Sequence, residues 1–228
     1  MYKGQGLPKG VLNIVPGLGH IAGKALGLHM DVDCIGFTGS TEVGRVLMQQ
    51  CSHDIKNLGL ELGGNAPFIV FEDADLDEAV MGALGSKFRN AGQTCICANR
   101  IYVQDGVYDA FAQKLADKVG ELLVGDPFSA SVSIDPMIDQ NGVDKAQNHV
   151  DDALSKGAKV IFGGFQHALV GTFFTPTVLT GVTQDMKVSK EETFGPVAPL
   201  FRFHTEDEVI GYANDTEFGL AAYFYSRD

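Results

Sequence analysis

The sequence lacks any long apolar run. No stretch approaches the ~18 consecutive apolar residues of a membrane-spanning helix, and the opening residues Met-Tyr-Lys lead into no signal-peptide core. Only four cysteines occur, at positions 34, 51, 95 and 97, too few in a chain of this size to indicate a disulfide framework. Without an export signal, the expected setting is a reducing cytoplasm, with no association with a membrane.

Basic residues are also scarce. The chain has 17 Lys and Arg against 29 Asp and Glu, a net charge of −12, which disfavours binding to nucleic acid or to an anionic membrane. Residues 1–64 contain equal numbers of the two signs, so the whole excess lies in residues 65–228. This shift predicts a domain boundary near the Gly63-Gly64 pair, with one domain over 1–63 and a second over 64–228.

Candidate strands and helices alternate along the chain, which predicts the α/β class. Helices are expected from about Thr41 and over 76–88, 106–123, 141–155 and 206–214, where apolar residues recur at helical spacing. Short apolar runs predict strands at 11–15, 34–38, 58–62, 66–71, 100–104, 159–162, 175–179 and 220–225.

One strand leads through a glycine into a helix, in the stretch FTGSTEVGR that begins at Phe37. Such a junction directs backbone N–H groups and the positive end of the helix dipole at an anion, typically a phosphate. It is neither a P-loop nor a GxGxxG motif, because Arg45 stands where Lys would and Gly39 and Gly44 are five residues apart. A glycine needed only for a tight turn explains the pattern equally well.

The most unusual stretch is FRNAGQTCICANR, a polar loop that carries Cys95 between a predicted helix and a predicted strand. Free cysteines are usually buried and inert, but Arg89 and Arg100 flank this one, and nearby positive charge favours the reactive thiolate. A single Cys-x-Cys pair without a second ligand pair argues against zinc. A cysteine hydrolase with a Cys–His pair is possible in principle, but none of the six histidines lies in a motif that supports this function.

A single carboxylate, Glu61, stands at the end of an apolar strand and before two glycines in the stretch LELGGN. It is either a solvated acid at a strand end or a general base.

Taken together, these motifs resemble those of the NAD(P)-dependent aldehyde dehydrogenases, and most closely the succinate-semialdehyde dehydrogenases. The resemblance rests on FTGSTEVGR, LELGGNAPFIVFEDADLDEAV, SKFRNAGQTCICANRIYVQDGVYDAF and EETFGPVAPL. It implies part of a Rossmann-like cofactor domain followed by an α/β catalytic domain. It also implies a chain that lacks an N-terminal part and a C-terminal end, and a homo-oligomer for a full-length relative.

The resemblance assigns roles to individual residues. Cys95 matches the nucleophile and Glu61 the general base, while Arg89 matches the residue that binds the distal carboxylate of succinate semialdehyde. The positions that match contacts to NAD or NADP are Gly39, Ser40, Gly44, Leu62, Glu192 and Phe194. No metal is implied. Cys97 is interpreted as a small packing residue, with a reversible disulfide to Cys95 as the alternative.

The implied reaction is oxidation of an aldehyde, expected to be succinate semialdehyde, to the carboxylic acid through a thiohemiacetal and a thioester on Cys95. Two alternatives stay open: a catalytically silent truncated chain, and another substrate such as glutarate semialdehyde.

We predict that Cys95 is the thiol that limiting iodoacetamide alkylates first, because its loop is polar and flanked by two arginines, whereas Cys34 and Cys51 lie in apolar or helical runs. Peptide mass mapping after partial labelling measures the order. Faster labelling at any other cysteine contradicts the assignment of Cys95 as the nucleophile.

Overall fold

The computed structural model describes residues 6–228. Helices and strands alternate along the chain, so the predicted α/β class is confirmed. The chain divides into two compact units, Met1–Leu62 and Gly63–Asp228. Within residues 6–228, no helix is both long and apolar enough to cross a membrane.

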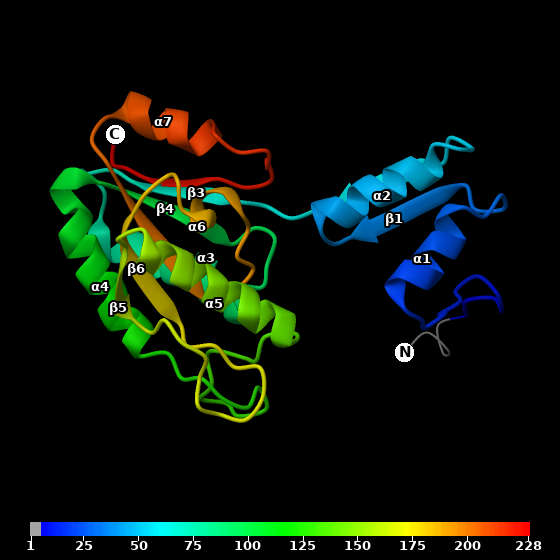
Figure 1. The fold of residues 1–228 in the computed structure, drawn as a ribbon, viewed down its shortest axis with the longest axis horizontal. Coiled ribbons are helices and arrows are strands. Elements are labelled where there is room, and N and C mark those ends of the chain that lie inside the picture. Colours follow the sequence, from blue (N-terminus) through cyan, green and yellow to red (C-terminus); the bar gives the residue numbers. More distant parts are fainter. Residues whose placement is uncertain (1–5) are drawn as a thin grey trace. The chain divides into compact units, whose positions relative to one another are not determined.

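The first unit contains one pair of parallel strands, β1 (Cys34–Thr38) and β2 (Asn57–Glu61), in which Thr38 pairs with Glu61. Helix α1 (Gly19–Gly27) precedes β1, and α2 (Thr41–Cys51) follows it and lies along it in Figure 1. Ser40 caps α2, because its hydroxyl accepts a hydrogen bond from the Val43 N–H at 3.4 Å. The expected strand–Gly–helix junction is therefore present.

The strand expected at 11–15 is wrong. The segment is irregular, and Ile14 and Val15 are 83% and 77% exposed. A short apolar run becomes a strand only when a neighbouring strand accepts its backbone hydrogen bonds, and the sheet of this unit consists of β1 and β2 alone among the described residues. The sequence pattern also missed α1, whose segment GHIAGKALG contains three glycines in addition to His20 and Lys24.

The second unit is built on a six-stranded sheet in the order β5-β6-β7-β4-β3-β8. All neighbours are parallel except β5 and β6. The strands are β3 (Ala66–Val70), β4 (Ala98–Gln104), β5 (Lys159–Phe162), β6 (Thr177–Val182), β7 (Val197–Phe203) and β8 (Tyr223–Tyr225). The helices are α3 (Leu76–Phe88), α4 (Tyr108–Gly120), α5 (Gln140–Ser155), α6 (Lys187–Lys190) and α7 (Glu206–Asn214), with short 3-10 turns at Arg89–Gly92 and Asp105–Val107 (Figure 1).

Helix α3 forms where the sequence predicts it. The Asp75 carboxylate accepts hydrogen bonds from the N–H groups of Asp77 and Glu78, which would otherwise be unsatisfied at the first turn. The face that carries Val80 and Ala83 is buried in the core. Capping and helical periodicity are both local features, which explains why the pattern was sufficient here.

Strand β7 was not predicted, although it is an interior strand of the sheet. It contains Pro199, which cannot donate a hydrogen bond and normally argues against a central strand. The neighbouring residues Ala198 and Leu200 are fully buried, and Leu200 pairs with Ile101 of β4. Burial of every residue of the strand except Arg202 therefore outweighs the lost backbone hydrogen bond.

Arg100 is the largest fully buried side chain of the core. Its Nε donates to the Asn65 carbonyl at 2.9 Å, and its two terminal nitrogens donate to the carbonyls of Tyr212 and Ala213 at 2.8 and 2.9 Å. The guanidinium thus joins the start of β3 and the last turn of α7 to β4.

We predict that Arg100→Leu lowers the free energy of unfolding by about 3 kcal/mol, because it removes the guanidinium donors from the buried Asn65 carbonyl and from the partly buried carbonyls of Tyr212 and Ala213. The matched control is Arg202→Leu, which removes a half-exposed guanidinium paired with Asp105 and Asp109 and should cost about 1 kcal/mol or less. Urea denaturation of both variants measures the difference. Equal losses would show that the buried contacts of Arg100 contribute nothing beyond those of a surface ion pair.

Candidate active site

Three segments of the second unit meet at the amino ends of its parallel strands. Gly64 stands just before β3, Cys95 just before β4 and Glu192 before β7. A Cβ added to Gly64 would lie 2.4 Å from the Cys95 carbonyl oxygen, so only glycine allows this approach. The Gly64 N–H also donates to the Glu192 carboxylate at 3.0 Å. The structure therefore brings together Cys95, the glycine pair and Glu192.

The loop before Cys95 has an unusual backbone. Asn90, Ala91 and Gly92 have φ angles of 52°, 53° and 75° in succession. The two non-glycine residues each cost on the order of 1–3 kcal/mol in this left-handed region. A Cβ on Gly92 would lie 2.2 Å from the Gly195 carbonyl oxygen, so this glycine is required by the close approach. The chain thus leaves α3 through a strained turn that packs against the segment before β7.

Gln93 holds this turn in place. Its N–H and its side-chain amide both donate to the Asn90 carbonyl, at 3.0 and 3.1 Å. Its side-chain oxygen accepts from the Ile138 N–H at 2.8 Å. These bonds tie the strained turn to the segment that leads into α5, and they offset part of its conformational cost.

The four cysteines differ in exposure. Cys95 is half-buried, Cys51 and Cys97 are buried, and Cys34 is exposed. The expectation that an apolar run shelters Cys34 is wrong, because the side chain projects from a two-stranded sheet that leaves it uncovered. Cys34 is consequently the real competitor of Cys95 in alkylation. The Cys97 N–H donates to the Thr94 carbonyl at 2.9 Å and closes a turn around Cys95. The disulfide alternative for Cys97 stays a prediction.

Glu192 lies against the glycine pair. A Cβ on Gly63 would lie 2.5 Å from Glu192 Oε2, so the carboxylate packs directly on the backbone there. Phe194, two residues later, is 38% exposed and has a φ of 50°. The segment that carries both residues is therefore strained and needs support from its neighbours.

A pair of buried asparagines supplies part of that support. The Asn99 side-chain amide donates to Asn65 Oδ1 at 2.7 Å and to the Glu191 carbonyl at 3.2 Å. The Asn65 amide donates to the Ser189 carbonyl at 3.0 Å. The Thr193 N–H donates to Asn99 Oδ1 at 3.4 Å. Two side chains at the starts of β3 and β4 thus fix residues 189–193.

Lys87 completes this buried network, and sequence reasoning missed it. Its side chain is 1% exposed, and Nζ donates to Asn99 Oδ1 at 3.2 Å. Burial lowers the pKa of Lys87 to about 8, while Cys97 and Glu192 act in the opposite direction. A signal was present, because position 87 follows Val80 and Ala83 on the buried face of α3.

In the first unit, Gly39 and Ser40 stand exposed at the carboxyl end of β1, and Leu62 follows the carboxyl end of β2. The Gly39 N–H donates to the Glu61 carbonyl at 3.0 Å. A Cβ on Gly44 would lie 2.8 Å from Leu62 Cδ2, so glycine lets α2 pack closely on that side chain. An exposed helix start at the carboxyl end of a parallel strand fits the pyrophosphate of a dinucleotide.

The remaining predicted side chains are Glu61 and Arg89, and both are exposed. Arg89 directly follows the last residue of α3, whose predicted end at residue 88 is observed. Within residues 6–228, no side chain or carbonyl forms a hydrogen bond or ion pair with its guanidinium. Glu61 belongs to the first unit and Arg89 to the second.

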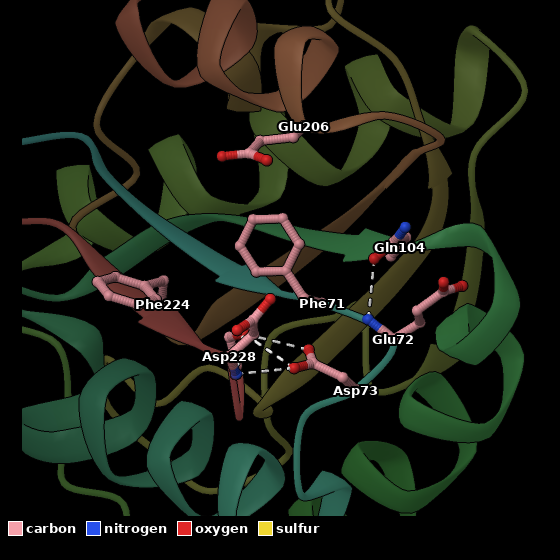
Figure 2. A pocket seen from close by; sticks show the side chains of 8 residues that line it. Phe71, Glu72, Asp73, Gln104, Glu206, Phe224 and Asp228 are labelled. Carbon is pink, nitrogen blue, oxygen red and sulfur yellow. Dashed lines mark hydrogen bonds between the residues drawn. The ribbon is translucent and has the colours of Figure 1, made fainter.

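A separate pocket of about 540 Å³ opens at the opposite ends of the strands, their carboxyl ends, and Figure 2 shows its lining. It lies where β3, β4 and β8 end, and it contains none of the predicted site residues. The Asp73 carboxylate accepts hydrogen bonds there from the N–H groups of Arg227 and Asp228, at 2.8 and 3.1 Å. In the part of the chain that the structure describes, no cluster of three or more metal-ligating side chains occurs.

We predict that raising the pH from 8 to 10.5 increases the free energy of unfolding of wild type, relative to that of Lys87→Met, by roughly 3 kcal/mol. In this window the unfolded chain carries the proton and the folded chain does not. Raising the pH therefore removes the cost of burying a charged ammonium. Only the wild-type protein becomes more stable, because the variant has no ammonium at this position. Denaturation at several pH values measures the change, with exposed Lys118→Met as the control. A pH-independent difference would mean that Lys87 is not desolvated.

Comparisons with known proteins show the family to which the chain belongs. The family model described as "Aldehyde dehydrogenase family" matches residues 1–228. The chain is 61% identical over 223 residues to a succinate-semialdehyde dehydrogenase (NADP(+)) of Escherichia coli, which covers 98% of this chain and 46% of that protein. It is 60% identical, with the same coverage, to a 3-sulfolactaldehyde dehydrogenase of Pseudomonas putida.

A solved structure gives the same result. The crystal structure of succinate-semialdehyde dehydrogenase from Burkholderia pseudomallei superimposes with a TM-score of 0.96 at 57% identity, covering 98% of this chain and 46% of that one. The chain thus spans about half the length of the relatives it matches. Because the family match extends over all 228 residues and the fold agrees, the chain belongs to the aldehyde dehydrogenase family.

Proposed function

We propose that this chain supplies the nucleophile, the general base and part of the cofactor site for NAD(P)-dependent oxidation of an aldehyde to a carboxylic acid. The observation that carries the proposal is the position of Cys95. Its thiol is half-buried in a strained loop, and its backbone packs on Gly64, whose N–H binds Glu192. Such a loop presents a thiol to a small molecule, whereas an inert structural cysteine is normally buried.

In the proposed reaction, the Cys95 thiolate attacks the aldehyde carbon, and the new C–S bond gives a tetrahedral thiohemiacetal. The negative oxygen of this intermediate needs hydrogen-bond donors, and the Cys95 N–H is one candidate. After oxidation, the acyl group remains on the sulfur as a thioester. A bound NAD or NADP would supply the hydride acceptor for that oxidation.

Glu61 is the proposed base for the second half of the reaction, in which it takes a proton from water so that the water can attack the thioester carbon. The C–S bond then breaks, which releases the carboxylic acid and returns Cys95 as the thiolate. Three peptide units join Glu61 to Gly64, and an extended chain of that length spans at most about 11 Å. Glu61 thus precedes by three residues Gly64, whose backbone approaches the Cys95 carbonyl.

Six residues are proposed to hold the dinucleotide. Gly39, Ser40 and Gly44 would accommodate the pyrophosphate at the start of α2, and Leu62 would contact the nicotinamide amide. Glu192 and Phe194 would hold the nicotinamide ribose and ring. The strained, partly exposed Phe194 supports this role, because an exposed aromatic ring offers a stacking surface.

The proposed substrate is a short aldehyde with an anionic group at its far end, and succinate semialdehyde is our choice. The names of the two relatives above specify a carboxylate-bearing and a sulfonate-bearing aldehyde. The exposed Arg89 guanidinium lacks a partner among the described residues and could bind either anion with two parallel hydrogen bonds. Glutarate semialdehyde is the alternative substrate. The proposed setting is the cytoplasm, and a homo-oligomer is proposed for a full-length protein that contains this chain.

The test of the proposal is the steady-state formation of NADH or NADPH from succinate semialdehyde. It uses this chain and a chimera in which it replaces the matching segment of the E. coli relative. The proposal requires that the chimera is active and that Cys95→Ala abolishes the activity. An inactive chimera that folds, or an active Cys95→Ala variant, would overturn it.

We predict that Arg89→Leu in the same chimera lowers kcat/KM for succinate semialdehyde by about two orders of magnitude, which corresponds to ~2.7 kcal/mol. Butanal, which has no carboxylate, serves as the control substrate and should react nearly as before. Initial rates with both aldehydes provide the comparison. An equal loss for both substrates would show that Arg89 acts on the loop or on the thiolate and does not bind the carboxylate.

A further inference from the structure

His149 is a buried histidine that lies between two side chains of residues 191–196, here called the EETFGP segment. It is 1% exposed on α5, and no sequence motif drew attention to it. Its Nδ1 lies 3.0 Å from Thr193 Oγ1, and its Nε2 lies 3.1 Å from Glu191 Oε2. These two partners flank Glu192, so one side chain contacts the residues on both sides of a predicted cofactor contact.

The chemistry of the partners determines the tautomer. An ionised carboxylate only accepts hydrogen bonds, so Nε2 carries the hydrogen and donates to Glu191. In a neutral ring Nδ1 then accepts, and the Thr193 hydroxyl donates to it. Burial lowers the pKa of His149, and Lys145 on α5 and Lys187 on α6 lower it further, while Glu191 opposes them. The neutral ring therefore satisfies both hydrogen bonds at neutral pH.

The EETFGP segment is held from two sides, by β4 and by α5. Asn99 holds the backbone at Glu191 and Thr193 from the strand side. On the α5 side, Ala146 lies close to Gly195, since a Cβ added to this glycine would lie 3.5 Å from the Ala146 methyl group. Between these two supports lies Phe194 with its left-handed backbone. Such a conformation persists only where the surroundings hold it.

We propose that His149 is a positioning residue that fixes Glu192 and Phe194 for the dinucleotide by holding the Thr193 and Glu191 side chains. The inference rests on the proposed function for its link to the cofactor, but the anchoring itself is a property of this chain alone. His149 does not touch the cofactor in this proposal. It acts through the side chains of Thr193 and Glu191. A hydrophobic replacement of His149 or of Thr193 should therefore make residues 192–195 more mobile.

The first test is amide hydrogen exchange of this chain without any dinucleotide. We predict that His149→Phe accelerates exchange at residues 192–195 about tenfold or more and leaves β4 unchanged. Thr193→Val should have a similar effect, and the double variant should add little to either single variant, because both remove one interaction. His149→Gln, which can still donate to Glu191, should recover part of the protection.

The matched control is Val150→Ala, which truncates the next residue of α5 within the core. Faster exchange throughout the second unit in His149→Phe, as expected for a generally destabilised core in Val150→Ala, would overturn the proposal. Unchanged exchange at 192–195 would also overturn it, whatever the activity of the chain.

The second test measures the link to the cofactor in the chimera defined above. His149→Phe should raise KM for the dinucleotide about tenfold, with a smaller effect on KM for the aldehyde. Faster exchange together with an unchanged dinucleotide KM would overturn the cofactor part of the inference. An inactive wild-type chimera would instead overturn the proposed function, and the exchange result would still decide the anchoring.

Discussion

The hydrogen bond between the side chains of Asn65 and Asn99 is the interaction on which the candidate site depends. Asn65 directly precedes β3 and Asn99 is the second residue of β4, and both side chains are almost completely buried. Through their amides they also bind the carbonyls of Ser189 and Glu191, so they fix the EETFGP segment against two strands. A buried amide group left without a partner costs on the order of 1–3 kcal/mol. Replacing either asparagine would therefore release several segments at once.

This network holds a site at the amino ends of the parallel strands of the large sheet, which is an unusual place. In open parallel sheets, ligands usually bind beyond the carboxyl ends of the strands. The first unit follows that rule, with Gly39 and Leu62 at the carboxyl ends of β1 and β2. In the second unit, Gly64, Cys95 and Glu192 stand at amino ends, while the acidic pocket of Figure 2 lies at the carboxyl ends. Buried amides and close glycine contacts replace the usual strand-end geometry there.

The sequence was most informative where structure depends on neighbouring residues. The Asp75 cap with the periodicity of α3, and the glycine junction before α2, are local features, and both elements form as predicted. Strand β7 was not predicted, and its Pro199 is unusual in a central strand; the strand expected at 11–15 has no strand to pair with among residues 6–228. Contacts such as that between Gly64 and Glu192, which are 128 residues apart, cannot be found from spacing alone. His149 was missed for the same reason, whereas the burial of Lys87 could have been found from its helical spacing to Val80 and Ala83 on α3.

The most direct test of the account is to trap the proposed thioester. The Glu61→Gln variant of the chimera would be mixed with succinate semialdehyde and NADP, quenched in acid and analysed by peptide mass spectrometry. The account predicts a succinyl group on the peptide that contains Cys95, accumulating because the base that activates water is gone. It also predicts that the adduct turns over without accumulating when Glu61 is present. A succinyl group on any other residue, or no adduct in an active protein, would contradict the assignment of Cys95 as nucleophile and Glu61 as base.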